Sequence, residues 1–157
     1  MNNHFQFESD FVESLRCIPM QVRLKLDTCG IKLKLHQWHK FNNQERQALV
    51  AMPCITERQI QAYRDFLSNL VAARTGEVAK DLPVETHPAW MSTEMIPDSV
   101  QIKAREVGEA VSLEQWASLE PLQRFALIKL SRSNHENTNF LPAMREFGLV
   151  KTNSPVS

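Results

Sequence analysis

The sequence predicts an all-α protein, a compact helical domain built from two related helix-turn-helix repeats. The first observation is an internal repeat: at an offset of 78 residues, ten of the 32 positions in 19–50 are identical in 97–128, whereas unrelated stretches of average composition share roughly two. The second observation is the helical spacing of apolar residues between helix-starting and helix-stopping residues. Self-similarity at a fixed offset indicates one structural unit built twice.

Each copy is expected to fold as helix, stop, short connection and helix. Pro19 and Pro97 suit the first position of a helix, where a missing N–H costs nothing. Gly30 and Gly108 suit the left-handed residue that ends one. The other identical pairs are Val22/Val100, Lys25/Lys103, Leu35/Leu113, Gln37/Gln115, Trp38/Trp116, Arg46/Arg124, Ala48/Ala126 and Leu49/Leu127.

The first element of the first copy is ambiguous. Apolar residues in 20–26 alternate as in a strand, but those in 100–107 of the second copy have helical spacing. Since both copies should share one form, we expect a helix in each. The alternation in 31–35 is compatible with a short strand, which the corresponding residues 109–113 do not support.

The clearest helix follows the first copy. Thr56 and Gln59 have capping-box spacing, and Gly76 is suited to ending the helix. One face carries the apolar residues Ile60, Tyr63, Leu67, Leu70 and Val71. Residues 77–96 have no sustained period and two internal prolines, so they are expected to link the copies.

The second copy carries its own start signals. Ser112 and Gln115 form another capping box, and Pro121 opens a helix so apolar that it should be buried on most sides. A last helix is expected over 140–147, ended by Gly148, followed by a flexible tail at 151–157.

Length and composition favour one ordinary globular domain over residues 1–150. The 157-residue chain is 43% hydrophobic and 23% charged, which is typical of globular proteins. No apolar run approaches the roughly 18 residues of a membrane span, and residues 1–10 lack the basic and apolar parts of an export signal. We therefore expect a cytoplasmic protein that has no membrane partner.

Charge is balanced overall but unevenly placed. Residues 16–40 hold six Lys or Arg against one Asp, whereas residues 77–120 hold nine Asp or Glu against three Lys or Arg. Two interpretations remain: the charges compensate each other across exposed faces, or they form a docking surface for a protein. A nucleic-acid partner is disfavoured because no segment has the dense cluster of cations that phosphate contacts need.

Positions shared by the copies are best explained by a shared fold, so specific activity is expected where the copies differ. They differ most at 131–139, a polar stretch between an apolar helix and Phe140. This stretch is expected to be a loop, and loops often carry recognition. The alternative is a capping loop in which Asn139 caps the last helix.

The histidines and cysteines suggest two kinds of chemistry. His36 and His39 stand three residues apart and, with Cys29 or Cys54, would provide zinc-ligand atoms. Cys17 and Cys54 precede expected helix starts, where a thiolate is favoured. The ligands are scattered, however, and no base or oxyanion site can be assigned to a cysteine. Phosphate-binding, serine-hydrolase and zinc-protease motifs are absent as well, so no catalytic, cofactor-binding or metal-binding residue is assigned and no enzyme is expected.

Two long segments carry a family resemblance. The first consists of residues 5–8 (FQFE), 10–27 (DFVESLRCIPMQVRLKLD), 30–33 (GIKL) and Trp38; the second consists of 123–132 (QRFALIKLSR), 135–137 (HEN) and 139–143 (NFLPA). Together they resemble the nitrate reductase-associated proteins of cyanobacteria. The resemblance implies a small cytoplasmic accessory protein that assimilatory nitrate reductase needs to become active, with the molybdenum cofactor and iron–sulfur cluster carried by the reductase.

The leading hypothesis is accordingly a non-catalytic maturation or stability factor that binds nitrate reductase through the basic first copy and the polar loop. The alternative is a carrier of molybdopterin or another small molecule, with a pocket between the copies lined by Trp38 and Trp116. The candidate partner-binding residues are Arg16, Arg23, Lys25, Lys32, Lys34, Arg132, His135, Glu136, Asn137 and Asn139.

Overall fold

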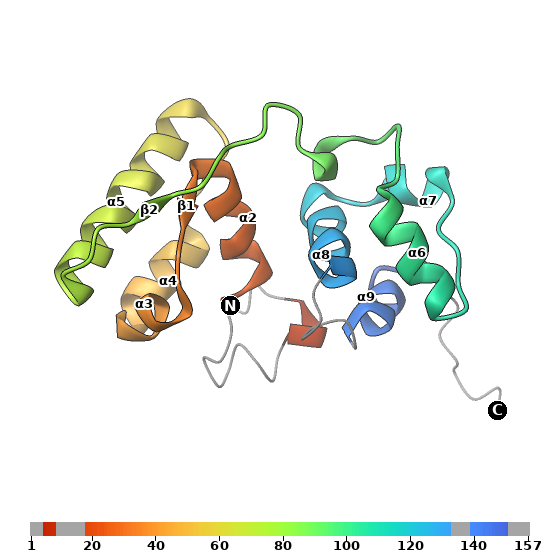
Figure 1. Ribbon diagram of the computed structural model, residues 1–157, viewed down its shortest axis with the longest axis horizontal. Coiled ribbons are helices and arrows are strands. Elements are labelled where there is room, and N and C mark those ends of the chain that lie inside the picture. Colours follow the sequence, from red (N-terminus) through yellow and green to blue (C-terminus); the bar gives the residue numbers. More distant parts are fainter. Residues whose placement is uncertain (1–4, 9–17, 133–138, 151–157) are drawn as a thin grey trace. The chain divides into compact units, whose positions relative to one another are not determined.

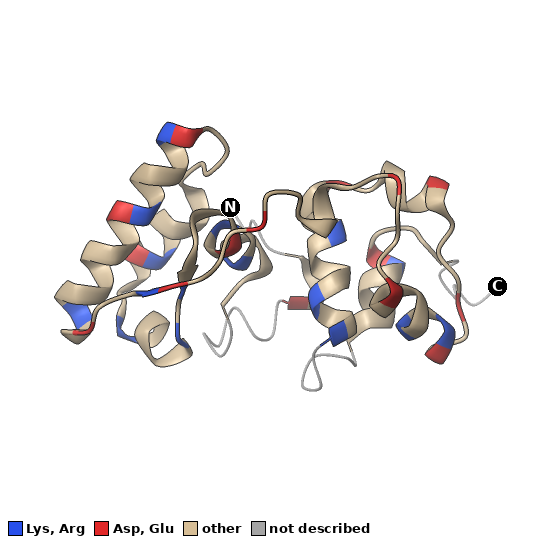
Figure 2. Ribbon diagram, turned by 45° about the horizontal axis from the view of Figure 1, so that its top comes forward, with Lys and Arg blue, Asp and Glu red and all other residues tan. Residues whose placement is uncertain are grey.

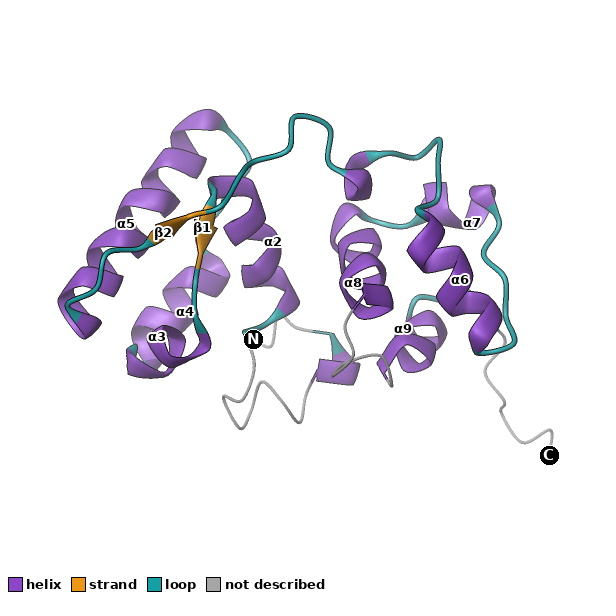
Figure 3. Ribbon diagram, viewed as in Figure 1, coloured by secondary structure: helices purple, strands orange, loops and turns teal. Residues whose placement is uncertain are grey.

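The computed structural model describes residues 5–8, 18–132 and 139–150. This part of the chain is mostly helical, with one small two-stranded sheet (Figure 1 and Figure 3). The fold is therefore compatible with the predicted all-α class. The chain divides into two compact units, Met1–Glu85 and Thr86–Ser157, each described separately below. Their boundary falls inside the predicted linker, 77–96.

The first unit contains a short 3₁₀ helix, four α-helices and two short strands among its described residues. They are η1 (Gln6–Glu8), α2 (Met20–Cys29), β1 (Ile31–Lys32), α3 (Leu35–Lys40), α4 (Asn43–Ala51), α5 (Glu57–Thr75) and β2 (Lys80–Asp81). The helix expected after Pro19 is confirmed. A strand is present at β1, but it is shorter than the segment 31–35 that the alternation suggests. Only Ile31 and Lys32 pair with β2, and α3 already begins at Leu35. Its antiparallel partner β2 lies in a segment expected to be a linker.

The long helix α5 begins and ends where the sequence places its signals. The Thr56 hydroxyl accepts a hydrogen bond from the Gln59 backbone N–H, and Gly76 adopts a left-handed conformation with φ of 72°. Helices α2 and α3 pack against α5. The buried face of α5 consists of Tyr63, Leu67, Leu70 and Val71. Full burial of each such side chain contributes about 1.5–3 kcal/mol, so this face anchors the unit.

Lys25 is half-buried and ties α2 to the end of α4. Its Nζ donates to the carbonyl oxygens of Val50 and Met52, at 2.6 and 2.7 Å, where α4 ends. The last carbonyls of a helix have no partner within it. Lys25 supplies a charged donor to one of them, that of Val50, and to the carbonyl of Met52, the residue just after α4. Burial lowers the pKa of Lys25.

The second unit is built around α8. Its elements are η2 (Ala89–Met91), α6 (Asp98–Glu106), α7 (Leu113–Ser118), α8 (Pro121–Arg132) and α9 (Phe140–Glu146). Helix α8 packs against η2, α6 and α9, and its residues 124–128 and 130 are buried. The predictions of a Ser112 cap, a helix opening at Pro121 and extensive burial of that helix are confirmed.

The expectation that Asn139 caps α9 is wrong. Asn139 has helical torsion angles, with φ of −89° and ψ of −4°, and its side chain makes no capping hydrogen bond. An N-cap residue normally has extended torsion angles that turn its side chain toward the first N–H groups. The other end agrees with expectation, since Gly148 has φ of 75° just beyond the helix.

Gly30 and Gly108 have the same backbone conformation but different surroundings. Their φ angles are 78° and 79°. A Cβ atom at Gly30 would lie 2.9 Å from Val84 Cγ2 and 3.1 Å from the Leu82 carbonyl oxygen, whereas nothing lies within 4 Å of one at Gly108. At Gly30 the segment that includes β2 therefore approaches the backbone closely.

This difference gives a matched pair of substitutions. We expect Gly108→Ala to cost about 1–2 kcal/mol, because a left-handed residue with a Cβ is strained. Gly30→Ala should cost about 1–3 kcal/mol more, since the added methyl group also overlaps the backbone at Leu82. Urea unfolding of both variants measures the difference, and equal losses of stability would contradict the close approach.

Candidate functional site

In each unit, a buried arginine joins two consecutive helices. Arg46 of α4 donates from Nη1 to the carbonyl oxygen of Trp38, at 3.3 Å, and to that of Phe41. Arg124 of α8 donates in the same way to Trp116, also at 3.3 Å, and to Leu119. The Trp38 and Trp116 carbonyls also accept from the Phe41 and Leu119 backbone N–H groups, so each arginine adds a second donor there and supplies a donor to the carbonyl just past the end of α3 or α7.

The shared glutamines hold the same helices at their amino ends. Gln37 Oε1 accepts from the Lys34 backbone N–H, and Gln115 Oε1 accepts from Ser112, each at 2.9 Å. Their Nε2 groups donate to different partners, the Glu77 carboxylate at 3.0 Å and the Leu149 carbonyl at 3.2 Å. Each glutamine thus ties a short helix to a distant segment of its own unit.

The second unit has a further connection through η2. The indole Nε1 of Trp116 donates to the Ser92 carbonyl oxygen, at 2.9 Å, and Arg124 Nε donates to the Trp90 carbonyl oxygen, at 2.6 Å. The Trp90 ring meets Phe125 edge-on at 5.0 Å. We call the junction of the short helix with the next one, held by Trp116 and Arg124 in this unit and by Trp38 and Arg46 in the first, the corner. Residues 88–92 cover the corner of the second unit, and we call them the strap.

The corresponding donors in the first unit have no acceptor among the described residues. Trp38 Nε1 and Arg46 Nε make no hydrogen bond within residues 5–8, 18–132 and 139–150, although Trp38 is only 2% exposed and Arg46 only 9%. We call these two atoms the open donor pair. A buried donor without an acceptor costs about 1–3 kcal/mol, so the first unit carries a cost that the second avoids.

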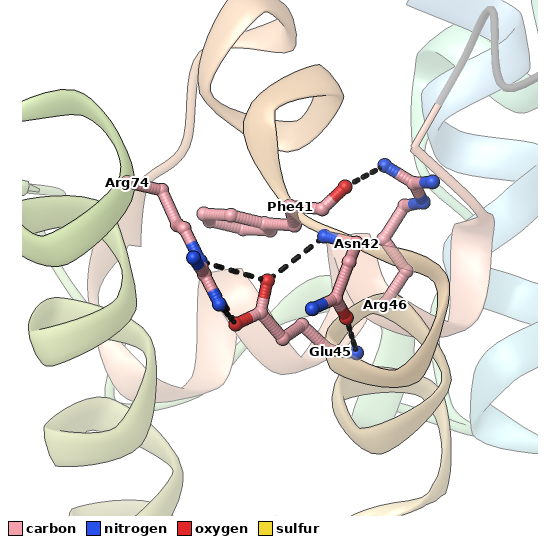
Figure 4. A network of polar contacts seen from close by, with 5 residues as sticks. All are labelled: Phe41, Asn42, Glu45, Arg46 and Arg74. Atoms are coloured by element: carbon pink, nitrogen blue, oxygen red, sulfur yellow. Dashed lines mark hydrogen bonds and ion pairs between the residues drawn. The ribbon is translucent and has the colours of Figure 1, made fainter.

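In the first unit, Glu45 and Arg74 form an ion pair on the side of the corner away from Arg46. Glu45 completes a capping box with Asn42 at the start of α4 and accepts from Arg74 of α5 through both carboxylate oxygens, with distances of 2.6–3.2 Å. Figure 4 shows Arg74 and Arg46 on opposite sides of Asn42. The hydrogen bonds from Arg74 lower the pKa of Glu45.

The predicted basic surface of the first copy is only partly exposed. Lys32, on β1, is exposed, while Lys34, just before α3, and Arg23, in α2, are half-buried. Lys25, also half-buried, donates from Nζ to the Val50 and Met52 carbonyl oxygens. Lys40, at the end of α3, is a further exposed cation, beyond those the sequence singled out.

Acidic residues from the predicted linker contact other side chains of the first unit. Glu77 lies 2.9 Å from His36, and Asp81 of β2 pairs with Arg64 of α5. Counted by unit, residues 1–85 hold eleven Lys or Arg and ten Asp or Glu, and residues 86–157 hold seven and eight. Figure 2 shows both signs along α5. Charge is thus compensated largely inside the first unit.

The polar loop is described only at its ends. Arg132 is exposed at the end of α8 and Asn139 is half-buried before α9. The candidates His135, Glu136 and Asn137 lie outside the described residues, as does Arg16 of the basic segment.

Cys29 and Cys54, the two cysteines among the described residues, have raised thiol pKa values. Burial raises the pKa of Cys29 to about 11, and burial also raises that of Cys54, against the smaller opposing effect of Lys25. The hypothesis of a favoured thiolate at Cys54 is therefore wrong, because loss of solvation outweighs the helix end it precedes. Cys17 lies outside the described residues.

The remaining candidates take other positions. His36 contacts Glu77, and no group of three or more His, Cys, Asp or Glu with metal-binding geometry occurs within residues 5–8, 18–132 and 139–150. Trp38 and Trp116 are buried in the interiors of their own units.

The unequal pairing of the two tryptophans can be measured. Trp116→Phe removes the donor to Ser92 and leaves a carbonyl unpaired, whereas Trp38→Phe removes an unpaired donor. Both lose similar aromatic volume, so we expect Trp116→Phe to be more destabilising than Trp38→Phe by about 1 kcal/mol or more. Chemical denaturation gives both values, and a larger loss for Trp38→Phe would contradict the assignment.

The Glu45–Arg74 pair predicts a pH dependence. Because the folded-state pKa of Glu45 lies below its ordinary value of 4.5, its contribution to stability is present above that value and lost as pH falls through the lowered one. Glu45→Gln should therefore be less stable than the parent near neutral pH, with a difference that shrinks in acid. Arg74→Met should show the same pattern, and the double variant should add little to either one. A difference independent of pH would exclude the ion pair as its cause.

One comparison with known proteins assigns a family. The family model described as conserved nitrate reductase-associated protein matches residues 4–147. No curated protein and no solved structure gives a match. The match covers most of the chain, including both shared corners and the strap, and agrees with the resemblance carried by residues 5–38 and 123–143. The chain belongs to the nitrate reductase-associated protein family.

Proposed function

We propose that this protein is a non-catalytic accessory factor that binds assimilatory nitrate reductase and supports its activity or cofactor assembly. The observation that carries the proposal is membership of the nitrate reductase-associated family across residues 4–147. The family is described by association with the reductase and not by a reaction, which favours a binding role over catalysis.

The chemistry of the described residues supports this choice. The shared polar side chains, Gln37 and Arg46 in the first unit and their counterparts in the second, hold helix ends together. The raised pKa values of Cys29 and Cys54 keep their thiols protonated near neutral pH. The arrangement therefore favours a scaffold that offers surfaces to another protein.

The proposed contact surface is the cationic edge, defined as Lys32, Lys34 and Lys40 around β1 and α3, with Arg132 and the polar loop as a second contact. Complementary charge mainly speeds and orients the encounter between proteins. We also propose that the two units are versions of one duplicated module, since α3 and α7 have bounds exactly offset by 78 residues and end with equivalent arginine contacts.

Among the described residues, no helix is long and apolar enough to cross a membrane. We propose a cytoplasmic location, which follows from the proposed partner, and a protein partner in place of a nucleic acid or membrane.

Binding through the cationic edge should depend on charge. The double variant Lys32→Glu/Lys40→Glu should bind the reductase about tenfold or more weakly, and raising the salt concentration should weaken the parent complex because exposed charges are screened. Arg105→Glu, an exposed cation of α6, is the matched control and should bind as the parent does. Calorimetry with purified reductase measures all three, and equal affinities would remove the cationic edge from the interface.

The role itself is tested by comparing the reductase from cells with and without this protein. Low activity with a normal molybdenum content supports a standing subunit, while low activity with a low molybdenum content supports maturation or cofactor delivery. Full activity with a normal cofactor content in the absence of this protein would overturn the proposal.

A further inference from the structure

The two corners differ in the partners of two buried donors. In the second unit, Trp116 Nε1 and Arg124 Nε both donate to main-chain carbonyls of the strap, from residues two apart in sequence. In the first unit, Trp38 Nε1 and Arg46 Nε are also buried, but none of the residues that the structure describes accepts from them. The helices that carry these donors correspond, and the contacts of the arginine Nη1 are the same in both units.

We propose that the open donor pair of the first unit is a recognition site for a short main-chain turn of the partner protein. The turn would place two carbonyl oxygens, from residues two apart, on Trp38 Nε1 and Arg46 Nε, as the strap does in the second unit. This inference rests on the proposed binding function and adds the chemical form of what is recognised.

The energetics favour a bound segment. Each buried unpaired donor costs about 1–3 kcal/mol, which is recovered when an acceptor arrives. A hydrogen bond from a guanidinium is stronger than one between neutral groups, so Arg46 is expected to contribute more than Trp38. Main-chain carbonyls carry little sequence information, and selectivity would therefore come from the side chains of the turn.

The surroundings also favour a polypeptide. In the strap, the residue that supplies one carbonyl also packs its ring against Phe125, so apolar contact accompanies the two hydrogen bonds. One donor of the open donor pair belongs to Trp38 of α3, and this helix ends at the exposed Lys40. A turn with acidic neighbours would thus satisfy both the donors and the cationic edge. Because the donors are buried, covering groups must move on binding, and association should be slower than for an open surface.

Indole resonances provide a direct test with the full-length protein. The chain has three tryptophans, so ¹⁵N labelling gives three indole N–H signals, assigned with Trp-to-Phe variants. The first probe is an unlabelled peptide with the sequence of residues 86–94, THPAWMSTE, which contains the strap. We expect the peptide to move the Trp38 indole proton downfield, as acceptance by a carbonyl requires, while the Trp116 signal stays in place.

Variants separate the donors from general destabilisation. Arg46→Lys keeps the charge but loses Nε, and should weaken peptide binding about tenfold. Arg74→Lys, on the other side of the corner, is the matched control and should bind as the parent does. The parent protein alone already decides the question if a variant does not fold, because its Trp38 signal either moves with peptide or does not.

The second probe is purified nitrate reductase, which separates this inference from the proposed function. A complex in which the Trp38 signal moves supports both. A complex that leaves the Trp38 signal unchanged overturns the inference while the proposed function stands. Peptide binding at Trp38 without any association with the reductase supports the recognition site but counts against the proposed partner. A free protein whose Trp38 signal is already that of a carbonyl-bonded indole would show that the chain fills the site itself, and would also overturn the inference.

Discussion

A buried guanidinium at the junction of two helices is the contact on which each unit depends. Arg46 and Arg124 each reach back from the second helix to the last carbonyls of the helix before it. A short helix of six residues has few internal hydrogen bonds, so its stability comes from such tertiary contacts. With a glutamine at its first turn and an arginine at its end, the helix is fixed in direction, and its tryptophan is held in the interior.

This use of polar residues has a consequence for function. The Gln, Trp and Arg side chains that the copies share are engaged in maintaining the corner, and the buried cysteines have raised pKa values. The units differ in what surrounds these side chains: a strap of the chain's own backbone in the second, and in the first two buried donors for which the described part of the chain provides no acceptor.

Charge illustrates how sequence order differs from spatial order. Along the chain, Glu77 and Asp81 follow the long helix and add to an acidic stretch that continues into the second copy. In space they return to the first unit, where they meet His36 and Arg64. The antiparallel pairing of β1 with β2 brings them back. The basic character of the first copy is consequently reduced to a small edge.

The sequence by itself determined the elements whose signals are local. The Thr56 and Ser112 capping boxes, the left-handed glycines and the apolar face of α5 each depend on residues within a few positions of one another, and all appear where they were expected. Only the tertiary structure decided that Lys25 bonds the end of α4, that residues 80–81 form a strand, that Asn139 does not cap, and that the strap supplies acceptors to Trp116 and Arg124. Those features depend on backbone carbonyls and on burial by distant segments. Because every residue has the same backbone carbonyl, the pattern of side chains does not indicate which carbonyl will accept a hydrogen bond from a distant donor.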